Sequence, residues 1–218
     1  GLASNIPIGD EAAVKAELYL VNGLNDDISD GGDALREARA NLESDNNNNK
    51  AVVGRVALSP ALGQEVALSG YTGSYDDDSS NISGAAVDWD FHALGFQVLG
   101  EAAFFSVEDG TIAEGDRAPS RLSGLYAEVN YPFWFDFLNE SFLGRSFEDP
   151  KLIPTFRYNL AEIEERGDTD DLDQDGYVVG LAYRPVQSFV LKTEWQWNQG
   201  DLERKDSDGF MASMAIGF

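Results

Sequence analysis

The last ten residues of the chain constrain its fold more than any other stretch. One side of this segment holds Phe210, Ala212, Met214, Ile216 and Phe218, and the other holds mostly small residues, Gly209, Met211, Ser213, Ala215 and Gly217. A period of two places successive side chains on opposite faces of a β-strand. In a soluble protein this apolar strand would leave a sticky edge open to other chains. A closed barrel in a lipid bilayer would pair the edge and turn the apolar face to the acyl chains, so the ending favours a transmembrane β-barrel.

Composition narrows the alternatives. The chain has 218 residues, enough for one domain, and carries 39 Asp and Glu against 15 Lys and Arg, a net charge of -24. This excess of negative charge disfavours nucleic acid as a partner and favours cations. No run of 18 apolar residues is present, which excludes a transmembrane helix but not the strands of a barrel. Cysteine is absent, which excludes disulfides, thiol catalysis and cysteine-bound metals.

Alternation of apolar and polar residues recurs along the whole chain. Gly1–Ile6 has the pattern of a strand already under way, and ten complete strands are expected after it. We therefore predict one domain over 1–218, all-β and antiparallel, that forms the C-terminal portion of a longer barrel. The ten strands are expected at 14–20, 51–59, 65–71, 87–91, 96–104, 125–131, 152–160, 177–183, 189–197 and 209–218.

The connections between these strands alternate in length. Short turns marked by Pro7, Pro60, Gly95 and Pro185 alternate with long polar loops at 24–50, 72–83, 108–120, 162–176 and 199–208. The connection 132–149 occupies a short position but is longer, and its aromatic cluster 133–137 is expected to be an interfacial anchor rather than an apolar path for a solute. Bacterial outer-membrane barrels have this asymmetry of periplasmic turns and external loops. Aromatic residues near strand ends are expected to form the girdles: Tyr71, Trp89, Phe91, Phe104, Tyr131, Tyr158, Tyr183, Trp195 and Trp197.

Several segments carry a resemblance to a known family. They are the stretches 16–23 (AELYLVNG), 48–60 (NNKAVVGRVALSP), 178–185 (VVGLAYRP) and 189–197 (FVLKTEWQW), together with the terminal Phe218. The chain resembles the C-terminal part of the phosphate-selective porin O and P family, and its end resembles the assembly signal of outer-membrane barrels. The resemblance implies a homotrimeric channel of about sixteen strands in the bacterial outer membrane, in contact with lipid, lipopolysaccharide and small solutes or ions.

The polar side of the expected strands predicts the residues that line the pore. Seven carboxylates stand against four basic residues and one histidine, and rings of carboxylates favour cations. Members of the resembled family that select anions line their pores with basic residues, so this lining departs from their pattern. The predicted pore-lining residues are Lys15, Glu17, Arg55, Glu65, Asp88, Asp90, His92, Glu101, Glu128, Arg157, Lys192 and Glu194.

Two motifs raise further hypotheses. Asp171, Asp173 and Asp175 form the D-x-D-x-D-G half of a calcium loop, for which the alternative is a solvated acidic loop. No other cofactor is expected. His92 follows Asp88 and Asp90 in steps of two, an arrangement that suits either a water-activating pair or a polar wall residue. Because no nucleophile motif accompanies His92, we predict no catalytic residues and no enzyme.

These observations predict a porin that passively conducts small hydrophilic solutes or ions. Two alternatives remain open within the same architecture: a non-conducting scaffold barrel that sheathes or binds an envelope partner, and a barrel hydrolase centred on His92. A soluble β-sandwich or lipocalin-like barrel has the same alternation, but it would turn its apolar faces inward.

Overall fold

The structure, a computed structural model, describes residues 1–28, 35, 38–39, 49–76, 80–110, 112, 118–166, 172–200 and 208–217. Eleven strands form one antiparallel sheet in which each strand pairs with its neighbour in sequence. The strands are β1 (Leu2–Ile8), β2 (Ala12–Asn22), β3 (Lys50–Ala61), β4 (Gln64–Ser74), β5 (Asn81–Ala93), β6 (Phe96–Val107), β7 (Arg121–Asn130), β8 (Lys151–Glu164), β9 (Leu172–Val186), β10 (Phe189–Gly200) and β11 (Gly209–Ile216), and a 3-10 turn, η1 (Asp136–Leu138), lies between β7 and β8.

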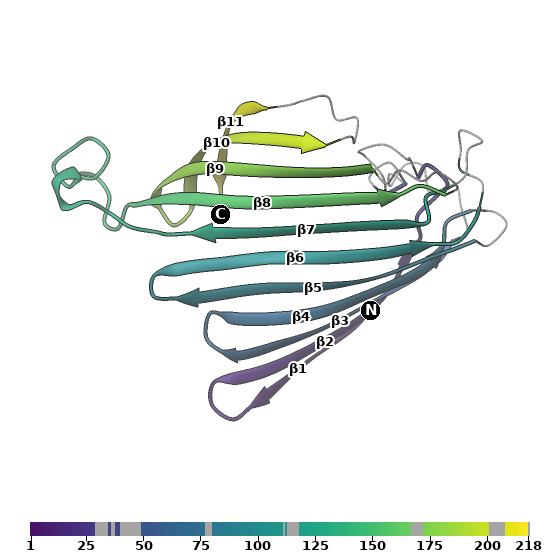
Figure 1. Cartoon of the computed structure of the whole chain (residues 1–218). Coiled ribbons are helices and arrows are strands. Elements are labelled where there is room, and N and C mark those ends of the chain that lie inside the picture. The colour runs from purple at the N-terminus through teal and green to yellow at the C-terminus, as the bar shows by residue number, and fades with distance from the viewer. Residues whose placement is uncertain are drawn as a thin grey trace.

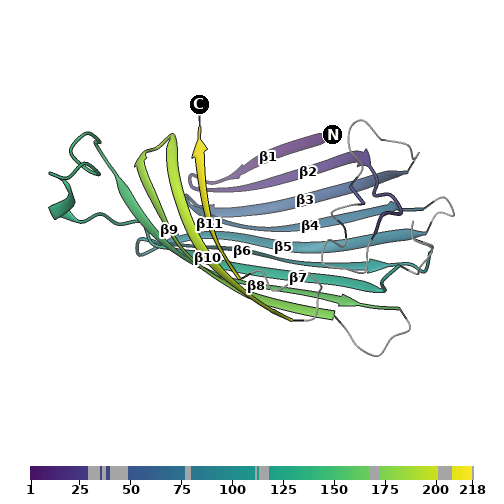
Figure 2. The same cartoon turned by 90° about the horizontal axis from the view of Figure 1, so that it is seen from above.

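The sheet is curled into an open trough, with β1 and β11 at its two margins (Figures 1 and 2). Within the described residues β1 pairs only with β2, and β11 pairs only with β10. The predicted all-β antiparallel architecture is therefore confirmed, with ten strands after the first among the described residues. No helix among the described residues has the length and apolar character needed to cross a membrane.

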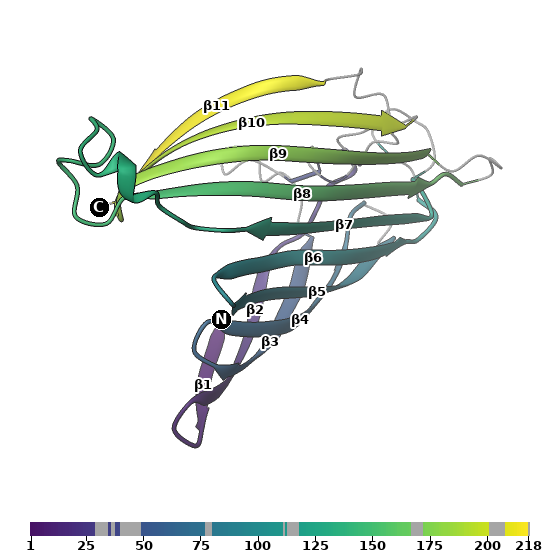
Figure 3. The ribbon, with the colours of Figure 1, turned by 60° about the vertical axis from the view of Figure 1, so that its left-hand side comes forward.

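Connections of two kinds lie at opposite edges of the sheet. At one edge, called here the short-turn edge, the links 9–11, 62–63, 94–95 and 187–188 contain two or three residues each. The five longer links 23–49, 75–80, 108–120, 165–171 and 201–208 begin and end at the other edge, the long-loop edge. The link 131–150 is the exception at the short-turn edge, and with η1 it projects beyond its neighbours (Figures 1 and 3).

Register assigns each side chain to a face of the sheet. Glu17 pairs with Arg55, and Asp88 with Glu101, so these charged residues share one face. Residues one step away in the strand point to the opposite face. The charged face is concave: Ile82, Val107 and Ile163, which come from three strands and share this face, gather with Ile28 in one cluster inside the trough. The convex face is apolar, and most of its large side chains are exposed.

Close packing between neighbouring strands relies on glycine at particular convex positions. Trp89 lies opposite Gly100 in the β5–β6 pair, and its ring covers the glycine. A Cβ atom at Gly100 would lie 2.4 Å from the Trp89 ring and 2.4 Å from the carbonyl oxygen of Tyr126. The Trp89 ring thus occupies the space that a side chain at position 100 would need. At Gly70, on the same face, an added Cβ would meet nothing closer than 3.9 Å.

Several strands are longer than the sequence pattern predicted. β1 continues through Pro7 to Ile8, so the turn begins at Gly9 rather than at Pro7. The predicted loops 72–83 and 162–176 begin and end in strand, because Ser74 pairs with Asn81 and Glu162 pairs with Asp173. The strands were predicted too short because their ends are polar. Backbone pairing with a neighbouring strand overrides the weak local preference of such residues for strand.

We predict that Gly100→Ala lowers the free energy of unfolding by about 1–3 kcal/mol, the usual cost of overpacking, because the backbone oxygen of Tyr126 cannot move aside as a flexible side chain would. Gly70→Ala, the matched control, should change the free energy by less than about 0.5 kcal/mol. The measurement is a urea titration followed by tryptophan fluorescence. Equal losses in the two variants would contradict the packing described here.

Candidate functional site

The twelve residues predicted to line a pore all lie on the concave face. They alternate along β2 to β7, β8 and β10, and cross-strand pairing keeps them on one side of the sheet. The face therefore carries a band of charge between the two edges. Its members are Lys15, Glu17, Arg55, Glu65, Asp88, Asp90, His92, Glu101, Glu128, Arg157, Lys192 and Glu194.

A first charged cluster is organised around Arg55 on β3. Its Nη2 atom lies 2.6 Å from Oδ1 of Asp88 on β5 and 3.0 Å from Oε1 of Glu65 on β4. Lys15 approaches the other oxygen of Glu65 at 3.6 Å, and the hydroxyl of Ser59 donates to that oxygen at 3.1 Å. One guanidinium thus joins strands at three successive positions in the sheet. These side chains keep roughly 30% of their surface exposed, apart from Lys15, which is more exposed.

A second charged cluster lies across β7 and β8. Arg157 donates to Oε2 of Glu128 through Nε at 2.7 Å and through Nη2 at 2.6 Å. The other Glu128 oxygen accepts from Nδ2 of Asn130 at 2.8 Å, and Asn130 in turn accepts from the Thr155 hydroxyl at 2.6 Å. Glu128 is only 7% exposed. Every polar group in this chain of contacts has a partner, as a buried carboxylate requires.

Contacts between single pairs of residues occupy the rest of the concave band. Lys192 and Glu194, two residues apart on β10, form an ion pair at 2.9 Å. Glu17 accepts a hydrogen bond from the hydroxyl of Tyr19 at 3.3 Å. No lysine or arginine in the described part of the chain forms an ion pair with Glu101. It lies opposite Asp88, so carboxylates face each other across β5 and β6.

His92, the single histidine of the chain, lies in the concave band. Its Nε2 atom lies 3.3 Å from Asp90, which also accepts two hydrogen bonds from Gln97 at 3.0 and 3.2 Å. The imidazole is about half exposed at the short-turn edge. Among the described residues no serine or threonine hydroxyl hydrogen-bonds to this ring, and the hydrolase alternative stays a hypothesis.

A hollow of about 470 Å³ opens on the concave face between the first cluster and β6–β7. Its lining includes Arg55, Asp88, Asp90, Glu101 and Tyr126. A second hollow of about 810 Å³ continues towards the short-turn edge and shares Glu65 and Asp90 with the first. Both hollows are open and include charged side chains in their linings, so water and small ions have access to the charged band.

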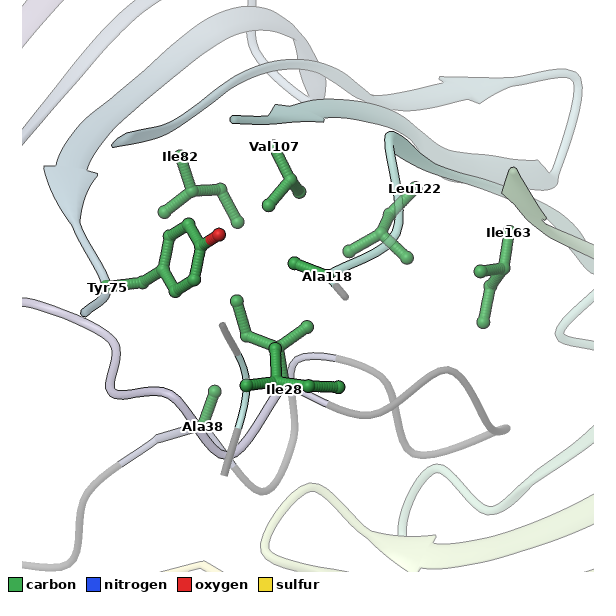
Figure 4. Close-up of a cluster of buried hydrophobic side chains, with 9 residues drawn as sticks. Ile28, Ala38, Tyr75, Ile82, Val107, Ala118, Leu122 and Ile163 are labelled. Atoms are coloured by element: carbon green, nitrogen blue, oxygen red, sulfur yellow. The ribbon is translucent and has the colours of Figure 1, made fainter. Parts of the chain in front are cut away.

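The concave face changes character at the long-loop edge, where apolar side chains fill the trough. Ile28, from the link 23–49, packs against Tyr75, Ile82 and Val107 (Figure 4). The full cluster, called here the apolar plug, comprises Ile28, Ala38, Tyr75, Ile82, Val107, Ile112, Ala118, Leu122 and Ile163. Sequence reasoning missed it, although the signal was present: inward positions beside the long loops, such as Ile82 and Val107, are apolar rather than charged.

Tyr71 and Tyr75 both belong to this region. Tyr71 was predicted to lie in the outer girdle, but its register partner is Gly84 on the concave face, and it packs against the apolar plug. The Tyr75 hydroxyl donates to the carbonyl of Glu108 at 2.8 Å. Burial, reinforced by the nearby Asp76 charge, raises the pKa of Tyr75 to about 12. Because the raised pKa favours the neutral form, Tyr75 contributes stability below pH 10 that is lost between about pH 10 and 12.

The predicted calcium motif is only partly described. Asp171 lies outside the described residues, and Asp173 and Asp175 belong to β9 rather than to a loop. An extended strand places two such carboxylates roughly 7 Å apart along one face, which does not wrap them around an ion. Among the described residues no group of three or more His, Cys, Asp or Glu side chains has the arrangement of a metal site. The calcium site stays a prediction.

Comparisons with known proteins give no relative: no family model, no curated protein and no solved structure matches the chain. The resemblance to the phosphate-selective porins therefore stays a prediction, and the function is argued from the molecule itself.

We predict that Arg157→Met lowers the free energy of unfolding by about 3 kcal/mol, because it leaves the carboxylate of Glu128 without its cation in a confined site. The double variant Arg157→Met/Glu128→Gln should recover at least half of that loss, since no unpaired charge remains. Urea titration of the two variants and the wild type measures both effects. A double variant as unstable as the single one would show that the pair acts through packing alone.

Proposed function

We propose that this chain forms most of the wall of a bacterial outer-membrane β-barrel, a porin that passively conducts small hydrophilic solutes or ions. The observation that carries the proposal is the distribution of side chains on the curled sheet. The convex face is apolar and open, with Val56 54% exposed, Leu68 60% and Phe210 62%. Patches of this extent on a protein mark contact with another apolar phase.

A soluble barrel would have the opposite arrangement. Lipocalin-like barrels and β-sandwiches turn their apolar faces inward to form a dry core. In this sheet the inward band holds ion pairs and an open hollow whose lining includes charged side chains. Lipid outside and water inside satisfy both faces at once, and the antiparallel ladder satisfies the backbone within the bilayer.

Aromatic residues on the convex face support the same orientation. Towards the long-loop edge, Tyr158 contacts Tyr177 at 5.1 Å between ring centroids, and Trp195 contacts Trp197 at 6.2 Å. Towards the short-turn edge, Phe96 contacts Tyr131 at 4.6 Å. Amphipathic rings prefer the two boundaries between lipid and water, so these groups suit the two girdles of a barrel, with long loops outside the cell and short turns in the periplasm.

Strand direction constrains how the barrel closes. β1 and β11 both run from the long-loop edge to the short-turn edge, since ten antiparallel steps separate them. If they paired directly, they would form a parallel pair in an otherwise antiparallel sheet. Closure by antiparallel pairing requires an odd number of further strands, and bacterial barrels have even strand totals. Five further strands would give the sixteen that the resemblance implies. The homotrimer and the contact with lipopolysaccharide are part of the same proposal.

The solute class follows from charge. The five links at the long-loop edge contain 22 acidic and 6 basic residues, a net charge of -16 out of the -24 of the chain. The predicted lining adds three more negative charges than positive ones. A negative entrance and a carboxylate-rich wall concentrate cations and repel anions. We therefore infer a preference for cations.

A second candidate has one observation in its favour. The apolar plug fills the trough at the long-loop edge, which suits a non-conducting barrel that holds or sheathes an envelope partner. The two functions differ in a single measurement. Protein extracted from its membrane in native form should produce discrete conductance steps in a planar bilayer if it is a porin. A silent bilayer, with insertion verified by protease protection, would favour the scaffold.

We predict a cation preference that depends on the concave carboxylates. In a tenfold KCl gradient the reversal potential should have the sign of a K⁺-selective pore, because the wall and the entrance are negative. The double variant Asp90→Asn/Glu101→Gln should move it towards zero. Asp149→Asn, an exposed carboxylate on the short-turn side, serves as the control and should leave it nearly unchanged. An anion-selective reversal potential would contradict the proposed solute class.

The apolar plug yields a separate prediction. Replacing Ile28, which is 2% exposed, by Asp puts a charge among apolar side chains and should release the segment from the trough. Single-channel conductance should then rise, because the aqueous path at the long-loop edge widens. Asp26→Asn, two residues earlier in the same link, is the matched control. An unchanged conductance in Ile28→Asp would place the narrowest part of the path elsewhere.

A further inference from the structure

The link between β7 and β8, residues 131–150, is an ordered projection rather than a tight turn. The other links at the short-turn edge have two or three residues, whereas this one extends well past them (Figures 1 and 3). Its first residues continue the sheet, because Phe133 and Leu152 exchange backbone hydrogen bonds of 2.9 and 2.8 Å. We call it the aromatic projection.

Internal hydrogen bonds fix the shape of the aromatic projection. Backbone bonds join Leu138 to Phe135 at 2.9 Å, Ser141 to Leu138 at 3.0 Å and Arg145 to Ser141 at 3.0 Å. The Nε1 atom of Trp134 donates to the side chain of Asn139 at 2.9 Å. The segment is therefore preorganised, and side chains on its surface are held in place at low entropic cost.

One side of the projection is fastened to the sheet by Tyr183 of β9. The ring of Tyr183 stacks on Trp134 at 6.2 Å and meets Phe147 edge-on at 6.5 Å. Its hydroxyl donates to the carbonyl of Leu143. This contact fixes which side of the projection is covered and which side remains open.

The open side carries a continuous row of aromatic rings. It starts on the convex face at Phe96 and passes through Tyr131, Phe133 and Phe135 to Phe137, with centroid separations of 4.6, 6.0, 4.8 and 5.2 Å. The ring at the far end of the row is the most exposed, with Phe137 at 74% against 44% for Phe96. The row therefore extends the convex apolar surface beyond the end of the strands.

Phe142 adds a second exposed ring near the tip of the projection, at 77% exposure. Fixed, exposed phenylalanines of this kind cost free energy in water, which indicates that the native surroundings of the projection cover them. The aromatic row is continuous with the convex face. The medium that covers Val56, Leu68 and Phe96 on that face therefore also covers the row.

We propose that the aromatic projection binds the lipid surface of the periplasmic leaflet, with Phe137 and Phe142 in the boundary between headgroups and acyl chains. This inference rests on the proposed function, which places the convex face in the bilayer. Because the projection is joined to a wall already in the membrane, its effective concentration at the lipid surface is high, and a few rings suffice for stable contact.

Charge selects this occupant over a second copy and over anionic lipid. Residues 131–150 contain four acidic residues and one basic residue, a net charge of -3. Two copies meeting through the same projection would bring these charges together, and a strongly anionic surface would repel them. A zwitterionic surface carries no such penalty. The carboxylates Asp136 and Glu140, both exposed, can remain in the aqueous layer beside the buried rings.

The absence of cysteine from the chain allows a direct test by site-directed spin labelling. Phe137→Cys and Phe142→Cys, each carrying a nitroxide, are reconstituted in phosphatidylcholine vesicles and probed by electron paramagnetic resonance for collision with oxygen and with a water-soluble nickel complex. Val56→Cys, on the convex face, is the lipid reference. Asp10→Cys, in the turn 9–11, is the water reference. Urea titration verifies that each variant is folded.

We expect the oxygen-to-nickel collision ratio at both projection sites to exceed that of Asp10→Cys several-fold and to approach that of Val56→Cys. A ratio equal to the water reference, with Val56→Cys still in lipid, would overturn the inference and leave the proposed function intact. Dipolar broadening between labels at the projection sites would overturn it in favour of a second copy. If Val56→Cys itself were accessible to nickel, the proposed function would fail.

Discussion

The whole structure depends on one geometric constraint, the alternation of side chains along paired antiparallel strands. Each pairing fixes which residues share a face, so a shift of one residue in any strand would send its apolar set to the wrong side. The direct ion pair Glu128–Arg157 locks the register of β7 against β8, since a slip would separate the two charges. Such charged positions give the concave face its polarity, and the alternate positions give the convex face its apolar character.

The concave face carries charged side chains in one region and apolar side chains in another. Ion pairs lie between the two edges and towards the short-turn edge, where open hollows admit water. Apolar side chains gather at the long-loop edge, where Ile28 returns from a link into the trough. A charged wall and an apolar cluster can share one face because they lie at different places on it: water reaches the charged side chains, and the apolar side chains bury one another. The boundary between them determines how much of the trough water can occupy.

Strict alternation made much of this architecture predictable. β10 separates charged from aromatic residues without exception, so its first residue and its two faces could be predicted from the sequence, although the strand continues three residues further to Gly200. The predicted bounds failed where polar strand ends, such as Thr72 and Ser74, owe their strand conformation to a neighbour that no local pattern reveals. Tyr71 was misassigned because an aromatic residue near a strand end suits a girdle and an inner cluster equally well. The ion-pair partners could not be predicted, since Arg55 bridges Glu65 and Asp88 through the curvature of three strands.

For the proposed porin, the distribution of charge has a consequence for transport. Along the wall most described carboxylates are paired with arginine, lysine or hydrogen-bond donors, so the net field there is smaller than the number of charges suggests. Most of the surplus negative charge is instead carried by the links of the long-loop edge. Conduction requires sites that attract an ion without retaining it. In the proposed pore, the surplus of negative charge at the entrance raises the local concentration of cations. Most carboxylates of the wall are already paired, so few of them bind a passing cation tightly. Attraction therefore depends on the links and release on the wall.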